Sequence, residues 1–204
     1  MMSEIKDKYQ SIATTSQGLY KEKGSKFLSF AFPVTNEAEI KLIQKDLRKK
    51  YYDARHHVFA WRLGVDEDKY RASDDGEPAN SSGMPVLGQI RSHELSDILI
   101  VVVRYFGGTK LGVPGLINAY KTAAKEAIEN NTFITKTITR CYRISFAYEQ
   151  MNNVMRKLKE FKIEQQNPIF ETTCTIDIYM KLSECEIAEY LFDDNPKIEI
   201  KEII

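Results

Sequence analysis

Short apolar stretches and stretches with helical spacing alternate along the first two-thirds of the chain. Residues 25–33 are rich in apolar side chains and predict a strand. Asn36 follows and can cap a helix together with Glu39, which stands at the capping-box position. Apolar residues then recur at helical spacing as far as Leu47, and residues 58–63 predict a second strand. This part of the chain is therefore expected to be β-α-β.

The segment 98–103 is apolar at every position and rich in β-branched residues. Such a run is typical of a central strand that is buried on both faces. Before it, residues 81–82 are serines that can cap a short helix, and after it Pro114 stands where a helix can begin. Asn130 and Asn131 can end that helix. The expected order up to this point is β-α-β-(β)-α-β-α.

The last third of the chain has a separate pattern of the same general kind. Its strands and helices alternate as β-α-β-β-α-β, the split arrangement of ferredoxin-like domains. The predicted elements lie at residues 138–148, 151–161, 162–165, 174–180, 183–192 and from 198 onwards. A linker at about residues 131–136 then separates two α+β domains, 1–131 and 136–204.

Composition restricts the kinds of partner and compartment. The 204 residues include 29 Lys+Arg and 29 Asp+Glu, so the zero net charge excludes a uniformly basic nucleic-acid surface, and any attraction to phosphate must be local. Cys141, Cys174 and Cys185 form no C-x-x-C motif and are expected to be thiols in a reducing compartment. The chain begins without an apolar stretch and contains no run of membrane-spanning length. A cytoplasmic protein without membrane contact is predicted.

An acidic loop at residues 73–78 is the first candidate for chemistry. Asp74, Asp75 and Glu77 lie within four residues, so each carboxylate benefits from a cation or a hydrogen-bond donor. They could bind a divalent cation or act as a general base. The alternative is a tight turn, because Asp-Gly and Glu-Pro both favour turns. The spacing does not match an EF-hand loop.

Arg55, His56 and His57 enter the second predicted strand. Because adjacent residues of a strand point to opposite faces, the two histidines should not face one pocket, and a two-histidine metal site is disfavoured. Ion pairs between this segment and the acidic loop need no catalysis to explain them. The sequence contains no G-x-S-x-G motif, and no nucleophilic triad, metal site or cofactor is predicted.

A glycine-rich loop, R-Y-F-G-G-T-K-L-G, follows the central strand and leads into a helix. Backbone N–H groups at Gly107 and Gly108, the helix dipole and the charges of Arg104 and Lys110 could bind an anion. Alternatively the glycines allow turns and a close crossing of strand and helix. We expect residues 74–77 and 107–112 to converge beside the carboxyl end of the central strand as one polar cleft.

Several motifs in the same order resemble the IMPACT/YigZ family. They are KGSKF at 23–27, DARHH at 53–57, SDDGEP at 73–78, GMP at 83–85 and VVVRYFGG at 101–108. The resemblance covers essentially the whole chain. It implies an N-terminal domain like domain 2 of ribosomal protein S5 and a ferredoxin-like C-terminal domain similar to the last domain of elongation factor G. Family members often have a small Ala-Gly-Thr-Ala-Gly run where residues 79–83 are Ala-Asn-Ser-Ser-Gly, and Pro114 removes one backbone donor from the last helix start.

Eukaryotic relatives in the family look like regulators of translation that interfere with the activation of a kinase acting on an initiation factor. The resemblance therefore implies a binding protein whose partner is RNA, the ribosome or a translation factor. Arg55, Arg104, Lys110 and the cationic stretch 45–50 would make the contacts. The alternative is a hydrolase that uses the histidines and the acidic loop, with or without a metal. We prefer binding, because no motif fixes a nucleophile, a base and oxyanion donors together. A scaffold with no small ligand is a third option.

Overall fold

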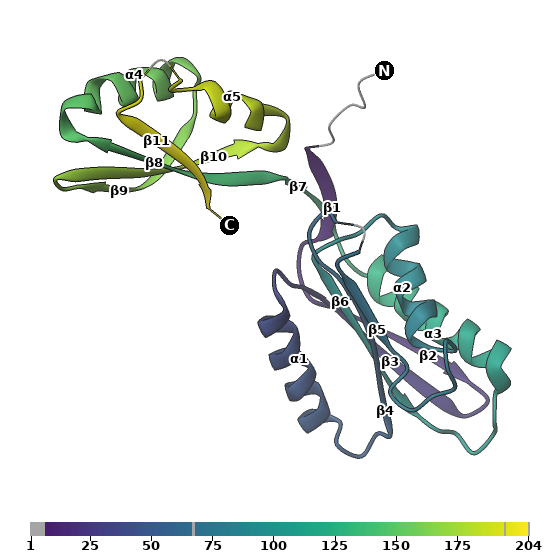
Figure 1. Ribbon diagram of the computed structural model, residues 1–204. Helices are drawn as coiled ribbons and strands as arrows, with labels where there is room; N and C mark the ends of the chain where they lie inside the picture. Colours follow the sequence, from purple (N-terminus) through teal and green to yellow (C-terminus); the bar gives the residue numbers. More distant parts are fainter. Residues whose placement is uncertain (1–6, 67, 194, 204) are drawn as a thin grey trace, which may run out of the picture. The chain divides into compact units, whose positions relative to one another are not determined.

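The computed structural model describes residues 7–66, 68–193 and 195–203. Residues 9–136 form a compact N-terminal unit, and residues 137–204, together with Asp7 and Lys8, belong to a second unit. Figure 1 shows the elements of each unit. The segment predicted as a linker at 131–136 is largely strand β7 (Phe133–Thr137), which pairs with β1 (Lys8–Ile12). This pairing joins residues far apart in the sequence, so local sequence could not predict it.

The N-terminal unit is built on a five-stranded antiparallel sheet with the order β2-β3-β6-β4-β5. The strands are β2 (Ser16–Glu22), β3 (Ser25–Pro33), β4 (His56–Arg62), β5 (Tyr70–Ser73) and β6 (Ile98–Tyr105). Helices α2 (Gly83–Ser92) and α3 (Gly112–Glu129) cover one face, and α1 (Glu37–Lys50) covers the other (Figure 1). The sequence predicted β3, β4, β6 and the three helices but not β1 or β2.

Strand β6 is the centre of this unit, as its apolar run predicted. Ile98, Ile100 and Val102 belong to the core beneath α2 and α3. Leu99 and Val101 belong to the core beneath α1, and all five side chains are at most 1% exposed. Because both faces of β6 are buried, the position of its carboxyl end, where Arg104 lies, is set by packing on both sides.

The N-terminus of α1 has the predicted cap. Asn36 Oδ1 accepts a hydrogen bond from the Glu39 backbone N–H at 3.0 Å. Glu39 Oε2 accepts in return from the N–H of Thr35 at 2.8 Å, one residue before the position of an ideal capping box. The cationic residues at 48–50 lie in the last turn of the helix, where they complement its dipole.

The C-terminal unit has the predicted order β-α-β-β-α-β. Its elements are β8 (Thr139–Ala147), α4 (Met151–Glu160), β9 (Glu164–Phe170), β10 (Thr173–Lys181), α5 (Cys185–Tyr190) and β11 (Ile198–Ile203). The strands form one antiparallel sheet in the order β11-β8-β10-β9. Residues of α4 and α5 pack on the apolar positions of β8 and β10. Among the described residues, no helix has the length and apolar character needed to cross a membrane.

Candidate functional site

A cleft of about 880 Å³ lies at the carboxyl end of β6 in the N-terminal unit. The residues that lead into β4, the end of the acidic loop, the end of β6 and the start of α3 all contribute to its wall. The lining residues are Asp53, Ala54, Arg55, His56, Glu77, Pro78, Arg104, Tyr105, Phe106, Lys110, Leu111, Gly112, Val113 and Leu116. The cleft therefore combines three cationic side chains with aromatic and aliphatic ones.

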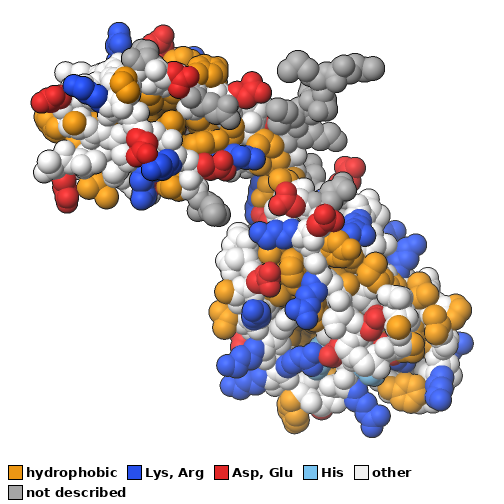
Figure 2. Space-filling model, in the orientation of Figure 1, with side chains coloured by type: hydrophobic (Ala, Val, Ile, Leu, Met, Phe, Trp, Pro, Cys, Tyr) orange, Lys and Arg blue, Asp and Glu red, His pale blue; other side chains and the backbone are white. Residues whose placement is uncertain are grey.

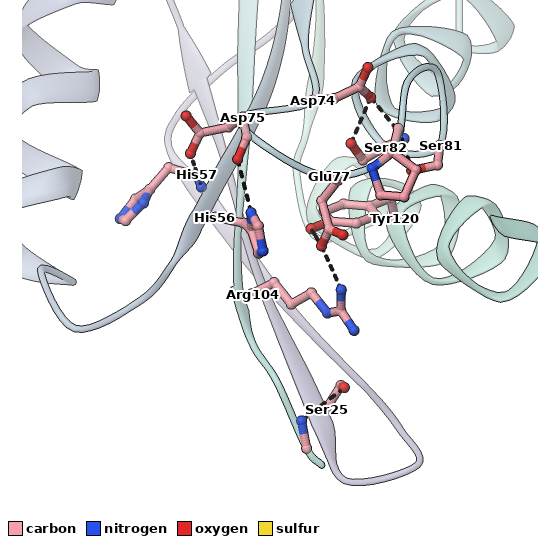
Figure 3. Close-up of polar contacts among 12 residues, drawn as sticks. Ser25, His56, His57, Asp74, Asp75, Glu77, Ser81, Ser82, Arg104 and Tyr120 are labelled. Carbon is pink, nitrogen blue, oxygen red and sulfur yellow. Dashed lines mark hydrogen bonds and ion pairs between the residues drawn. The ribbon is translucent and has the colours of Figure 1, made fainter. Parts of the chain in front are cut away.

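A buried ion pair between Glu77 and Arg104 forms part of the wall (Figure 3). Arg104 Nη1 donates to Glu77 Oε1 at 2.6 Å, and the Tyr120 hydroxyl donates to the same oxygen at 2.8 Å. The side chains of Arg104 and Glu77 are 7% and 5% exposed. Burial, and then the neighbouring Glu77 carboxylate, raise the pKa of Tyr120, which keeps the phenol protonated as a donor. No pattern in the sequence pointed to Tyr120 as part of this site.

Asp74 does not line the cleft, which corrects its inclusion among the candidate ligand residues. Its Oδ1 accepts hydrogen bonds from Ser82 N, Ser82 Oγ and Gly83 N, and its Oδ2 accepts from Asn80 N. Burial alone would raise the pKa of Asp74, but these hydrogen bonds outweigh it and the pKa is lowered. Asp74 thus caps α2 from outside the helix, a role that the two serines were expected to have.

The carboxylate of Asp75 likewise makes its hydrogen bonds outside the cleft. Its Oδ2 accepts from His57 N at 2.6 Å, and its Oδ1 accepts from Arg48 Nη2 at 2.7 Å. Burial opposes ionisation, but the hydrogen bonds from Arg48 and His57 outweigh it, so the pKa of Asp75 is lowered. The backbone of Asp75 is left-handed, with a φ of 45°, and this turns the side chain away from that of Glu77. Within the described part of the chain, no three metal-ligating side chains come together.

The two histidines lie on opposite faces of β4. His56 lines the cleft, and its Nδ1 lies 2.9 Å from the Asp75 carbonyl oxygen. His57 is 5% exposed and lies outside the cleft lining, so it too is a correction to the candidate set. Burial, followed by the nearby Arg48 charge, lowers the pKa of His57. The two adjacent histidines therefore point to opposite faces of the strand, as predicted.

Gly107 and Gly108 also lie outside the cleft lining. Gly107 packs against the β2–β3 turn, where a Cβ atom would lie 1.9 Å from the Gly24 carbonyl carbon. Its N–H donates to Ser25 Oγ at 3.1 Å and is directed to that turn. Gly108 has a φ of 87°, which few other residues adopt. The close packing of Gly107 and the positive φ of Gly108 agree with the alternative in which these glycines allow a turn and a close approach of backbone.

Residues 74–77 and 107–112 were predicted to converge in one cleft, and this is correct for only part of each loop. Glu77 from the first loop and Lys110–Gly112 from the second line the same cleft. The sequence missed Tyr105 and Phe106, although they directly follow the central strand, where binding side chains often gather. It also missed the apolar contribution of α3, since Val113 and Leu116 resembled ordinary helix residues.

Comparison with known proteins gives relatives along most of the chain. The family model described as the Impact N-terminal domain matches residues 23–128, which is more than half of the chain. IMPACT family member YvyE of Bacillus subtilis (strain 168) is 28% identical over 87% of this chain and 83% of that protein. IMPACT family member YigZ of Escherichia coli (strain K12) is 34% identical over 65% of this chain and 66% of its own.

A eukaryotic protein and a solved structure extend the similarity. Protein IMPACT homolog of Dictyostelium discoideum is 31% identical over 59% of this chain, but the match covers 34% of that longer protein. A crystal structure described only as that of a hypothetical protein is 26% identical, with a TM-score of 0.74. That match covers 98% of this chain and 99% of the other, so it includes both units.

Proposed function

The chain belongs to the IMPACT family, and from this premise we propose that it is a translation-associated protein whose N-terminal unit binds single-stranded RNA. Ribosomal RNA, and the messenger and transfer RNAs that ribosomes bind, all contain single-stranded segments. The cytoplasm is the compartment that this role requires. The similarity of the family's eukaryotic members to translation regulators supports the role, and the cleft supports the kind of ligand.

The observation on which the proposal rests is an exposed aromatic residue between two cationic clefts. Phe106 is 56% exposed and lines both the 880 Å³ cleft and a second cleft of about 500 Å³. The first cleft has Arg55 and Lys110 at its wall, and the second has Lys21 and Lys26. Proteins that bind single strands combine these two features, because bases stack on aromatic rings while cations follow the phosphates.

The local charge is compatible with a chain of zero net charge. Lys21, Lys26, Arg55 and Lys110 are all exposed on the N-terminal unit. On the face shown in Figure 2, lysine and arginine side chains lie among apolar ones over this unit. A local group of cations attracts phosphates within about 10 Å at moderate salt, which is the Debye length at 0.1 M. The overall balance of charge therefore does not prevent contact with RNA.

The domain folds that we propose agree with this role. The N-terminal unit would be a domain like domain 2 of ribosomal protein S5. The C-terminal unit would be ferredoxin-like, similar to the last domain of elongation factor G, and its β-α-β-β-α-β order supports this. Because such folds host many activities, the aromatic and cationic residues of the clefts remain the argument for RNA.

The hydrolase alternative is less well supported by the geometry. It used His56 or His57 with the carboxylates of Asp74, Asp75 and Glu77. His57, Asp74 and Asp75 lie outside the cleft, and the oxygens of both aspartates accept hydrogen bonds from backbone or side-chain donors. The pair that remains, His56 and Glu77, lacks an identified nucleophile, so we do not develop this function further.

Binding of a short single-stranded RNA to the whole protein tests the proposal. Affinity should fall steeply as salt rises, and it should weaken in Lys110→Ala and Lys26→Ala. Lys41→Ala removes an exposed lysine from α1 that is outside the lining of both clefts, and it serves as the matched control. If ribosomes and RNA are not bound at any salt concentration, or if the control variant weakens binding equally, the proposal is wrong.

A further inference from the structure

We propose that the cleft receives the end of the RNA strand, with a terminal phosphate monoester held between the N-terminus of α3 and Arg104. The inference rests on the proposed RNA binding and adds to it a preference for one chemical group. It concerns a phosphate on either the 5′ or the 3′ end, because both present the same monoester. Three properties of the cleft support it: open backbone donors, a buried guanidinium and a surplus of positive charge.

The first property is the uncapped start of α3. The helix is 18 residues long, and Gly112 and Val113 at its beginning line the cleft. Among the described residues, no side chain caps this end: Leu111 is the N-cap residue, and its side chain has no polar atom. The first N–H groups of a helix have no partner within it and bear a partial positive charge. At α3, Pro114 has no N–H, but Gly112 and Val113 have one each and line a cleft that contains cationic side chains, which suits an anion.

The second property is independent of the helix. Arg104 lines the cleft with a side chain that is only 7% exposed, and its Nε atom has no hydrogen-bond partner among the described residues. This donor is covered by protein, and a buried donor without a partner is costly, so a shift of the side chain that lets a ligand oxygen accept from it is favoured. Nη1 is bound to Glu77, and the rings of Phe27 and Phe106 lie 5.4 and 5.6 Å from the guanidinium carbon. These contacts hold the guanidinium at the wall of the cleft before any ligand binds.

The third property is the balance of charge. The lining contains the cations Arg55, Arg104 and Lys110 and the carboxylates of Asp53 and Glu77, which leaves one surplus positive charge. The helix end adds about half a charge. A phosphate monoester has a charge of about −1.5 to −2 near pH 7, whereas an internal phosphodiester has about −1. The monoester therefore complements the cleft better than any phosphate within the strand.

The rest of the strand has a continuous path away from the cleft. Tyr105 and Phe106 line both clefts, so a nucleotide whose phosphate is at α3 can place its base against Phe106. The following phosphates then reach the second cleft, where Lys21 and Lys26 lie.

The test compares one short RNA sequence with three kinds of end: 5′-phosphate, 3′-phosphate and hydroxyl at both ends. One phosphorylated form should bind about tenfold more tightly than the hydroxyl form, as expected for one added charge-assisted contact. Arg104→Lys keeps a positive charge beside Glu77 but removes Nε, so it should abolish the preference while RNA still binds. Lys41→Ala should retain the preference.

NMR of the unmodified protein gives a second measurement, which does not depend on whether the Arg104 variant folds. In the unmodified protein, the amide NMR signals of Gly112 and Val113 should shift with the phosphorylated RNA and not with the hydroxyl-ended RNA. Equal affinity for all three ends, with binding still weakened by Lys26→Ala, would overturn the end preference and leave the proposed RNA binding intact. Absence of binding to every RNA would overturn both.

Discussion

Arg104 and Glu77 are 27 residues apart in the sequence, yet Nη1 of the first lies 2.6 Å from Oε1 of the second. Arg104 is near the end of the central strand, and Glu77 lies in the loop that precedes α2. The ion pair, together with the hydrogen bond from Tyr120 of α3, joins three parts of the N-terminal unit at the cleft. The pair therefore fixes the shape of the cleft as well as supplying charge.

Removal of one partner of this pair should be costly. Arg104→Met leaves the Glu77 carboxylate buried with only Tyr120 as a donor, and we expect a loss of about 3–5 kcal/mol in the free energy of unfolding. The double variant Glu77→Gln/Arg104→Met should lose clearly less than the sum of the two single losses. Urea unfolding of all four proteins measures this. Additive losses would show that the two side chains are not energetically coupled.

Asp74 should stabilise the start of α2 in a pH-dependent way. Asp74→Ala removes the acceptor of four hydrogen bonds, so we expect a loss of about 1–3 kcal/mol at neutral pH. Because the pKa of Asp74 is lower in the folded protein than its reference value of 3.8, the unfolded chain takes up this proton first. The contribution is thus present above pH 3.8 and is lost as the pH falls through the folded pKa.

Stability curves against pH check this expectation. Asp74→Ala should reduce the decline in unfolding free energy below pH 3.8, and Asp74→Asn, which retains an acceptor, should be the milder variant at neutral pH. Asp46→Ala, on an exposed part of α1, controls for the loss of a surface carboxylate at neutral pH. A variant as stable as the unmodified protein would contradict the capping role.

The sequence predicted most of the fold because the decisive signals were local. The apolar run at 98–103 and the cap at Asn36 each depend on neighbouring residues, and both are found as expected. Strand β1 was missed because its pairing partner β7 lies far along the chain, and β2 was missed because its own residues have no clear apolar pattern. Strand β1 pairs with β7, and its Gln10 also forms a bridge with Leu95, which is 85 residues away in the sequence.

The candidate site was harder to predict, because the spacing of residues in the sequence does not show which way their side chains point. Asp74, Asp75 and Glu77 are almost adjacent in sequence, but only Glu77 faces the cleft. The difference arises from the left-handed backbone at Asp75 and from a helix end eight to nine residues after Asp74. Tyr120, the hydroxyl partner of Glu77, is 43 residues away, so no short motif includes both.

His57 should titrate abnormally. Its pKa is lowered below 6.5, first by burial and then by the charge of Arg48, so the folded protein binds this proton less readily than the unfolded chain does. The unfolding free energy should therefore fall as the pH is lowered below 6.5, because protonation favours the unfolded state. NMR titration of the His57 ring in native and denaturing conditions gives both midpoints. A native midpoint at or above the denatured one would contradict the expectation.

Gly107 should tolerate no side chain, whereas Gly88 should accept one. A Cβ at Gly107 would lie 1.9 Å from the Gly24 carbonyl carbon and 2.1 Å from Ser25 N, so backbone must move. We expect Gly107→Ala to cost at least about 2–3 kcal/mol. At Gly88, inside α2, no atom lies within 4 Å of the added Cβ, and alanine should stabilise the helix by about 0.5–1 kcal/mol. Thermal unfolding of the two variants compares these effects.

Phe106 and Lys26 should affect RNA binding in different ways. Stacking of a base on an aromatic ring contributes about 1–3 kcal/mol and involves no counterion, so Phe106→Ala should weaken binding about tenfold or more without changing the salt dependence. Loss of one phosphate contact in Lys26→Ala should instead reduce the slope of log K against log salt by about 0.7, the value for a single strand. Phe106 is 56% exposed, so its replacement should leave the unfolding free energy nearly unchanged. Affinities measured over a series of salt concentrations separate the two effects. If Phe106→Ala bound RNA as tightly as the unmodified protein, the aromatic ring between the two clefts would not be a stacking platform, and only electrostatic contacts would remain.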